Sequence, residues 1–230
     1  MKLLIATPAF GGLISTGYGK SAIQTKELLM KNNNINVHFY FIDNESLIQR
    51  ARNQCATFAL KSKYDRILFI DADISWEPND LVKILNSDKA VVGGTYPTKC
   101  IPPYINFNPL MKDIDTHFPN QFDRSMDCFT KYKEVCADKN GEAEVMHVPT
   151  GFLQIHISVL EKLSKVVEQY KSGKDNETRY DFFPVKVRNG ILESEDWGFC
   201  SLCRDNGIRV YLQTNVVLTH TGTYEFRASL

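Results

Sequence analysis

Short apolar runs alternate with stretches of helical spacing along the first hundred residues of the chain. The apolar runs predict strands over 2–7, 36–42, 66–70 and 90–95. Apolar residues at helical spacing predict helices over 20–31, 46–60 and 79–85. Ser46 suits the N-terminal cap of the second helix, and Pro78 suits the first turn of the third. Strands that alternate with helices are typical of an α/β fold in which helices flank a mostly parallel central sheet.

The pattern changes in the second half of the chain. Four prolines interrupt the stretch from about 97 to 141, which has little periodicity: Pro102, Pro103, Pro109 and Pro119. Long irregular segments of this kind are usually functional, so we expect an excursion over the active face. Further strands are predicted over 144–148, 208–212 and 216–218, and helices over 158–170 and from 193 or 194 to Asn206-Gly207. We expect residues 1–230 to form one domain.

Composition narrows the class of protein. The 230 residues are 43% hydrophobic, which is enough to bury a full core. Lys plus Arg and Asp plus Glu both number 27, so nucleic acid is a disfavoured partner. The apolar start of the chain stops at Pro8, too short for a signal peptide or a membrane span, and we expect a cytoplasmic protein. Six scattered cysteines predict reduced thiols, with Cys200 and Cys203 on the buried face of a helix.

Two aspartates, Asp71 and Asp73, directly follow the continuous apolar run at 66–70. The carboxyl edge of an open α/β sheet is where ligands bind. Two acids beside a buried strand end are costly unless a cation or hydrogen-bond donors compensate their charge. A divalent metal ion is one explanation, since it prefers hard oxygen ligands. The alternative is a turn capped by Asp71, with Asp73 in solvent.

A second acidic pair, Glu195-Asp196, opens a predicted helix near the other end of the chain, and His220 follows the last predicted strand. Acids in the first turn of a helix are also favoured by the helix dipole alone. A histidine that joins Asp71 and Asp73 would complete a ligand set suited to Mn²⁺ or Mg²⁺. The residue types therefore favour a metal site, with a purely structural role as the alternative.

Taken in order, these motifs resemble the GT-A glycosyltransferases, particularly the inverting group that includes the family 2 enzymes. The resemblance covers nearly the whole chain. Its motifs are Thr7-Pro8, Arg50-Ala51-Arg52-Asn53, Ile70-Asp71-Ala72-Asp73, Pro149-Thr150-Gly151-Phe152, Glu195-Asp196-Trp197-Gly198-Phe199 and His220. The resemblance implies a Rossmann-like fold for nucleotide-diphospho-sugar transfer.

The resemblance also implies roles for single residues. Asp73 corresponds to the acid that binds the metal, Asp71 to the one that contacts the ribose or the metal through water, and His220 to the residue that completes coordination. The positions expected around the nucleotide are Thr7, Pro8, Arg50 and Asn53. Gly151 is expected to leave room for the donor sugar.

The implied activity is a metal-dependent hexosyltransferase that moves a sugar from a nucleotide-diphosphate donor, with a UDP-sugar favoured, to a hydroxyl of a glycan, a protein or another acceptor. Asp196 would act as the catalytic base of an inverting reaction, supported by Glu195. GDP-mannose is the alternative donor. A retaining reaction is the alternative mechanism.

Other classes remain as hypotheses. A haloacid-dehalogenase-like phosphatase also uses two aspartates after a strand, but normally on the first strand of its core. A P-loop nucleotide hydrolase is suggested by Gly19-Lys20-Ser21, yet Ile14 stands where that loop needs glycine. A non-catalytic carbohydrate-binding protein is the third alternative.

Aromatic residues near the acidic motifs are candidate contacts for sugar rings. Trp76 and Trp197 flank the motifs, with core packing as the alternative for Trp197. An acceptor groove would draw on Tyr104, Phe107, Phe118, Phe122, Tyr180, Phe182 and Phe183. These aromatic side chains would otherwise only anchor their loops.

Overall fold

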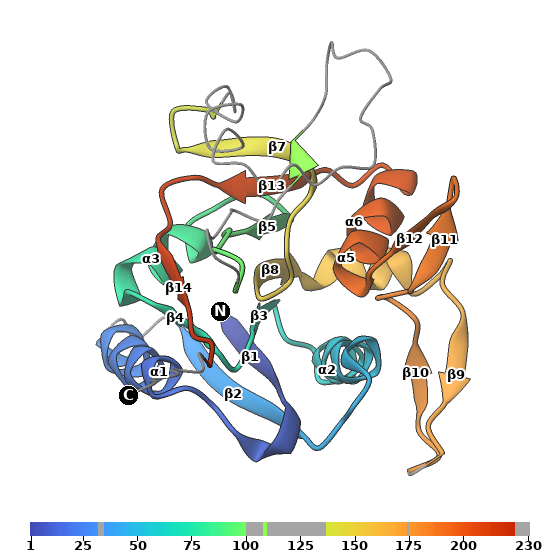
Figure 1. Ribbon diagram of the computed structural model, residues 1–230, viewed down its shortest axis with the longest axis horizontal. Helices are drawn as coiled ribbons and strands as arrows, with labels where there is room; N and C mark the ends of the chain where they lie inside the picture. The colour runs from blue at the N-terminus through green and yellow to red at the C-terminus, as the bar shows by residue number, and fades with distance from the viewer. Residues whose placement is uncertain (32–34, 100–107, 110–136, 174, 224–230) are drawn as a thin grey trace, which may run out of the picture.

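The computed structural model describes residues 1–31, 35–99, 108–109, 137–173 and 175–223. Its centre is an eight-stranded sheet of order β2-β1-β3-β8-β5-β13-β7-β6 (Figure 1). The strands are β1 (Lys2–Ala9), β2 (Asn36–Asp43), β3 (Arg66–Ile70), β5 (Val91–Gly93), β6 (Asn108–Pro109), β7 (Glu142–His147), β8 (Phe152–His156) and β13 (Val210–Gln213).

The sheet is mixed but mostly parallel. Strand β1 runs parallel to β2 and β3, and β13 runs parallel to β5. Strand β8 is antiparallel to both of its neighbours, β3 and β5, and β7 is antiparallel to β13 and β6. All strands except β8 and β7 therefore point the same way. The predicted fold class, an α/β fold with a mostly parallel central sheet flanked by helices, is confirmed.

Helices cover both faces of this sheet (Figure 1). They are α1 (Thr16–Met30), α2 (Ile48–Lys61), α3 (Pro78–Leu85), α5 (Ile157–Leu163) and α6 (Glu195–Asp205), with a short 3₁₀ turn η1 (Phe10–Gly12) after β1. Alternate residues of β1 serve opposite faces, since side chains alternate along a strand. Leu4 joins the core under α2, α5 and α6, and Leu3 joins the core under α1 and α3.

Several boundaries differ from those that the sequence pattern predicts. Helix α1 begins at Thr16 rather than at 20, because the Ser15 side chain accepts a hydrogen bond from the Tyr18 N–H at 3.0 Å. Ser46 is not the cap of α2, which begins at Ile48 after Leu47. The predicted helix over 158–170 ends at Leu163. Beyond it, β9 (Gln169–Lys171) pairs with β10 (Thr178–Tyr180).

The strand β8 is absent from the sequence prediction. Phe152, Leu153, Gln154 and Ile155 are all fully buried. A short run buried on both faces has no alternation, so the pattern alone does not distinguish it from a helix segment. The consequence for the site is direct: β8 is antiparallel, so its amino end, preceded by Gly151, lies at the carboxyl edge of β3.

Two small pairings also lie outside the prediction. Strand β4 (Ile74–Trp76) pairs with β14 (Leu218–His220), and β11 (Lys186–Arg188) forms a hairpin with β12 (Ile191–Glu193). The first pairing sets His220 opposite Ile74, close to the aspartates at 71 and 73. The cysteines Cys55, Cys200 and Cys203 are free and buried. Across the described residues, no helix combines the length and apolar character of a membrane span.

Candidate functional site

The turn at 71–73 lies where three strands meet at one edge of the sheet. Asp71 follows β3, Tyr96 lies beyond β5, and Gly151 precedes the antiparallel β8. The Asp71 N–H donates to the Gly151 carbonyl at 3.0 Å, and the Thr221 N–H donates to the Asp73 carbonyl at 2.8 Å. Backbone hydrogen bonds therefore fix this turn between the β8 loop and the segment after β14.

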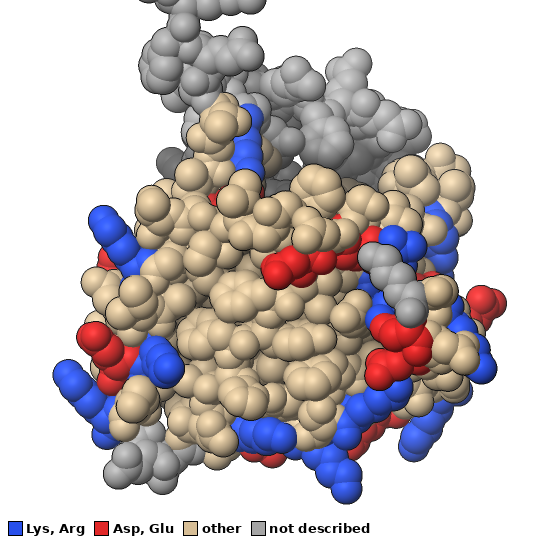
Figure 2. Space-filling model, turned by 90° about the horizontal axis from the view of Figure 1, so that it is seen from below, with Lys and Arg blue, Asp and Glu red and all other residues tan. Residues whose placement is uncertain are grey.

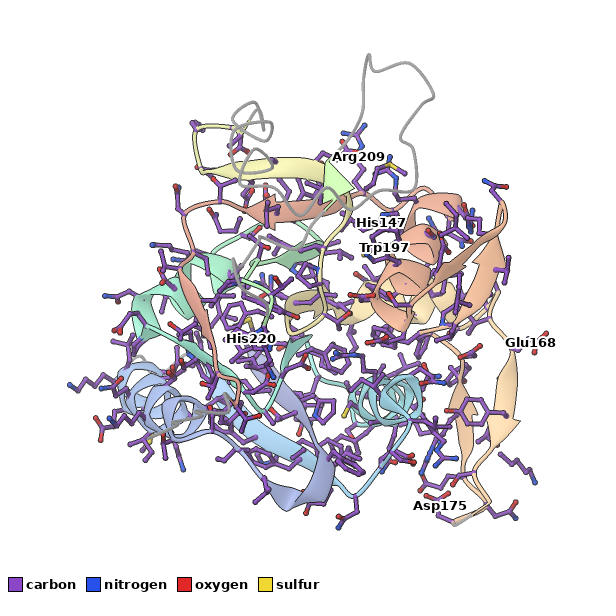
Figure 3. All side chains as sticks on the ribbon, viewed as in Figure 1. His147, Glu168, Asp175, Trp197, Arg209 and His220 are labelled. Atoms are coloured by element: carbon purple, nitrogen blue, oxygen red, sulfur yellow. The ribbon has the colours of Figure 1, made fainter. Side chains whose placement is uncertain are left out.

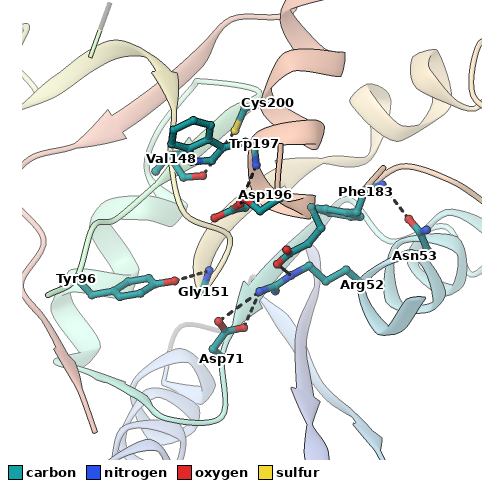
Figure 4. A network of polar contacts seen from close by, with 12 residues as sticks. Arg52, Asn53, Asp71, Tyr96, Val148, Gly151, Phe183, Asp196, Trp197 and Cys200 are labelled. Carbon is teal, nitrogen blue, oxygen red and sulfur yellow. Dashed lines mark hydrogen bonds and ion pairs between the residues drawn. The ribbon is translucent and has the colours of Figure 1, made fainter. Parts of the chain in front are cut away.

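Gly151 permits a close approach of two side chains. A Cβ added at this position would lie 2.3 Å from the Tyr96 hydroxyl oxygen and 2.8 Å from Asp71 Oδ2. The Gly151 N–H also donates to the Tyr96 hydroxyl at 3.2 Å (Figure 4). Any side chain at position 151 would therefore collide with Tyr96 and Asp71. The donor-sugar role of Gly151 stays a prediction.

Arg52 joins the two acidic motifs. Its side chain comes from α2 and is only 4% exposed, with Nη2 3.1 Å from Asp71 Oδ1 and Nε 3.3 Å from Glu195 Oε1 (Figure 4). Burial alone would lower the pKa of this guanidinium, but the charges of Asp71 and Glu195 outweigh burial and raise it above the ordinary value. Its Nη1 is buried and has no hydrogen-bond partner among the residues that the structure describes.

Arg50 and Asn53, which the resemblance places around the nucleotide, have partners outside the Asp71 and Glu195 contacts of Arg52. Arg50 forms a two-pronged ion pair with Glu45, at 2.5 and 2.7 Å. Asn53 uses both ends of its amide, donating to Asp181 and accepting from the Phe183 N–H, each at 2.9 Å. Arg52 belongs to the same motif, Arg50-Ala51-Arg52-Asn53. Helical periodicity was the signal that would have identified it as the arginine facing the core. Arg52 shares the buried face of α2 with residues three, four and seven positions further on: Cys55, Ala56 and Ala59.

Thr7 and Pro8 lie in β1 beside α1. The buried Thr7 hydroxyl is 2.6 Å from the hydroxyl of Tyr18, so it is engaged within the core. Burial raises the pKa of Tyr18 to about 12, although its hydrogen bond with Thr7 acts in the opposite direction. Pro8 is half-buried and pairs in register with Ile42 of β2.

Asp73 and His220 come together as the sequence predicts. His220 Nε2 lies 3.4 Å from Asp73 Oδ1, and its Nδ1 lies 2.8 Å from the Pro97 carbonyl oxygen. Because a carbonyl only accepts, Nδ1 carries a hydrogen, which leaves Nε2 with its lone pair in the neutral ring. The ammonium of Lys99 bonds to the other carboxylate oxygen, Asp73 Oδ2.

The predicted set of three metal ligands is only partly assembled. Asp71 turns to Arg52, whereas Asp73 faces His220 and Lys99. Within the described part of the chain, no group of three or more His, Cys, Asp or Glu residues is placed to hold a metal ion. The reason is local: two turn positions separated by Ala72 direct their carboxylates toward different partners.

Asp196 and Glu195 form the first turn of α6. Asp196 Oδ1 accepts hydrogen bonds from the Ser194 hydroxyl and from the Trp197 N–H, the latter at 2.8 Å. Burial and the charge of Asp71 have larger effects on the pKa values of Arg52 and Tyr96, but the charge of Asp196 also raises both. Asp196 therefore lies close enough to interact electrostatically with Arg52 and Tyr96. The second acidic motif thus sits beside the first.

Trp197 packs against His147, with ring centroids 4.6 Å apart and planes 5° apart (Figure 3). Trp76 is buried and donates its indole N–H to Thr25 Oγ1 at 2.8 Å, so the idea of a sugar platform at Trp76 is wrong. Phe182 and Phe183 are fully buried core residues, not groove residues. The four aromatic positions predicted within 104–122 lie outside the described residues.

The charges on one outer face are arranged unevenly. Seen from below the view of Figure 1, a broad uncharged area is bordered by both basic and acidic side chains, with the larger acidic patch on one side of it (Figure 2).

Comparisons with known proteins identify the fold. No protein-family model and no curated protein matches the sequence. Among solved structures, A197 from STIV matches with a TM-score of 0.54 and 18% identity, over 97% of this chain and 87% of that one. This likeness shows a shared fold.

Two weaker structural matches are longer proteins. S. aureus TarS 1–349 in complex with UDP-GlcNAc matches with a TM-score of 0.46 and 14% identity, over 97% of this chain and 60% of that one. GalNAc-T7 with UDP, GalNAc and Mn²⁺ matches with a TM-score of 0.47 and 9% identity, over 96% of this chain and 43% of that one. At these scores neither match supports a conclusion about this chain.

Replacing Arg52 by methionine should lower the free energy of unfolding by about 3 kcal/mol, because Asp71 and Glu195 lose a buried counter-charge. Urea unfolding at pH 7 measures this loss. Arg209→Met is the control, since it removes the same charge from an exposed side chain and should leave the urea midpoint nearly unchanged. Equal losses in the two variants would contradict the role of Arg52.

The stability of the protein should depend on His147 below about pH 6.5, the ordinary histidine pKa. Burial lowers the pKa of His147 in the folded state, so the unfolded chain binds the proton more readily. Stability from this group is therefore present above pH 6.5 and is lost as pH falls toward the folded pKa. His147→Gln should reduce that loss, measured as the difference in unfolding free energy between wild type and variant from pH 7.5 to 5. A constant difference would refute the prediction.

Proposed function

We propose that this protein is a GT-A-type glycosyltransferase that moves a sugar from a nucleoside-diphosphate donor, with a UDP-sugar favoured, to a hydroxyl acceptor. The observation that carries the proposal is the meeting of two acidic motifs at one sheet edge, joined by Arg52. The fold supports it, since the carboxyl edge of an α/β sheet is the usual place for a nucleotide. In this proposal residues 1–230 act as one catalytic domain.

The donor side of the site is built from Asp73, His220 and Asp71. Two ligands of one octahedral ion, each about 2.1 Å from the metal, lie about 3 Å apart. The 3.4 Å between Asp73 Oδ1 and His220 Nε2 fits such a pair, and the hydrogen bond of Nδ1 to Pro97 leaves Nε2 suited to a metal. A bound Mn²⁺ or Mg²⁺ would neutralise charge on the departing diphosphate. Because Arg52 holds Asp71, we assign Asp71 to the ribose of the donor.

The acceptor side centres on Asp196. Two hydrogen bonds hold its Oδ1. We assign its other oxygen to the proton of the acceptor hydroxyl. As that proton moves to Asp196, the acceptor oxygen bonds to the anomeric carbon, and the bond from this carbon to the diphosphate breaks with inversion. Glu195 supports this geometry through its contact with Arg52.

The ion pair of Asp71 also favours a transferase over a haloacid-dehalogenase-like phosphatase. In such a phosphatase the first aspartate is a nucleophile, and a nucleophile needs an available lone pair aimed at its substrate. Here the guanidinium of Arg52 takes up the Asp71 carboxylate. An acid fixed in this way suits a binding role.

Asp196→Asn should reduce sugar transfer by about 10²–10⁴-fold, because the amide does not accept the acceptor proton. Nucleotide affinity should change little. The measurement is release of nucleoside diphosphate from UDP- and GDP-sugars with Mn²⁺. Asp205→Asn, which removes an exposed carboxylate at the other end of α6, is the control and should leave turnover unchanged. Unchanged turnover in Asp196→Asn would exclude Asp196 as the base.

A nucleoside diphosphate should stabilise the protein in a metal-dependent way. At 100 times its dissociation constant a ligand adds about 2.7 kcal/mol, which raises Tm by roughly 5–10 °C for a chain of this size. Thermal unfolding with UDP or GDP, with and without Mn²⁺, measures this shift. Asp73→Asn should abolish the Mn²⁺-dependent part, whereas Asp88→Asn at an exposed distant site should retain it. No shift with either nucleotide would defeat the proposed function.

A further inference from the structure

Each aspartate of the turn at 71–73 already has a cation from its own chain. Asp71 has Arg52, and Asp73 has Lys99. The two pairs differ in burial: the Arg52 side chain is 4% exposed, whereas Lys99 and Asp73 are 42% and 36% exposed. Exposed ion pairs contribute little to stability and exchange readily with solvent ions. The Arg52 pair is therefore a fixed part of the fold, and the Lys99 pair is replaceable.

The position of Lys99 is set by neighbouring parts of the site. Lys99 follows Pro97, whose carbonyl oxygen holds His220 Nδ1 at 2.8 Å. The stem of Lys99 runs beside Gly222, where an added Cβ would lie 3.2 Å from Lys99 Cδ. The lysine ammonium and the His220 ring therefore approach the same carboxylate from opposite oxygens.

We infer that Lys99 is an internal counter-ion held on Asp73 Oδ2, and that its charge opposes the binding of a divalent cation at Asp73 Oδ1 and His220 Nε2. In the protein without nucleotide, the metal then meets a carboxylate whose other oxygen already has a positive partner. The metal is bound weakly on its own and is held well only when the donor diphosphate adds its oxygens. The effect of Lys99 on metal affinity rests on the contacts of Asp73 alone. Only the role of this effect during donor binding rests on the proposed function.

The expected gain in Mn²⁺ affinity on removal of Lys99 follows from charge. Removing Lys99 frees the exposed Asp73 carboxylate from its ion pair. It also removes the repulsion between the lysine ammonium and a divalent ion a few ångströms away at this solvent-exposed site. Together these effects should tighten Mn²⁺ binding by about 5- to 10-fold. The effect should shrink as ionic strength rises, since salt screens exposed charges.

The experiment is titration of the full chain with Mn²⁺ alone, without nucleotide, followed by the EPR signal of free Mn²⁺. Lys99→Met should bind Mn²⁺ about 5- to 10-fold more tightly than wild type. Lys99→Arg keeps the charge and should resemble wild type. Lys165→Met removes an exposed lysine beyond α5 and should also resemble wild type. The double variant Lys99→Met/Asp73→Asn should lose the gain.

Equal Mn²⁺ affinity in wild type and Lys99→Met, with both folded by circular dichroism, would overturn the inference. So would a gain that survives in the double variant, because the metal would then bind elsewhere. Failure of the proposed function has a different signature. In that case neither UDP nor GDP shifts Tm in any variant, while the difference in Mn²⁺ affinity between wild type and Lys99→Met is still measured.

Discussion

The buried guanidinium of Arg52 is the interaction on which the site depends. It holds Asp71 from the end of β3 and Glu195 from the start of α6, two acids that lie 124 positions apart in the sequence. Two carboxylates near each other in a partly buried setting repel unless a cation lies between them. Arg52 supplies that cation, so α2, the turn at 71–73 and the first turn of α6 keep a common arrangement.

The same interaction makes the two aspartates of the turn unequal. Asp71 is neutralised from within the protein by a buried partner, whereas Asp73 faces the exposed side with His220 and Lys99. Asp71 therefore has a structural role in the site, whereas Asp73 is accessible to an incoming cation. This asymmetry is a consequence of backbone hydrogen bonds that fix the turn on both sides, to Gly151 and to Thr221.

Two strand pairings bring the remaining residues to this edge. Because β8 is antiparallel within a mostly parallel sheet, its amino end and Gly151 reach the carboxyl edge of β3. Because β14 pairs with β4, His220 returns to the aspartates from the far end of the chain. Neither pairing has a clear local pattern: β8 is buried on both faces, and β4 and β14 have three residues each.

The sequence by itself determined the alternation of strands and helices, the α/β class, the end of β3 at the aspartates and the start of α6 at its acidic pair. Those features depend on local periodicity and on caps, which neighbouring residues specify. Only the tertiary structure decided that Arg52 pairs with both Asp71 and Glu195, that Trp76 is buried, and that Asp71 and Asp73 have different partners. Those outcomes depend on contacts between distant segments, and burial and charge pairing are settled only when the segments pack together.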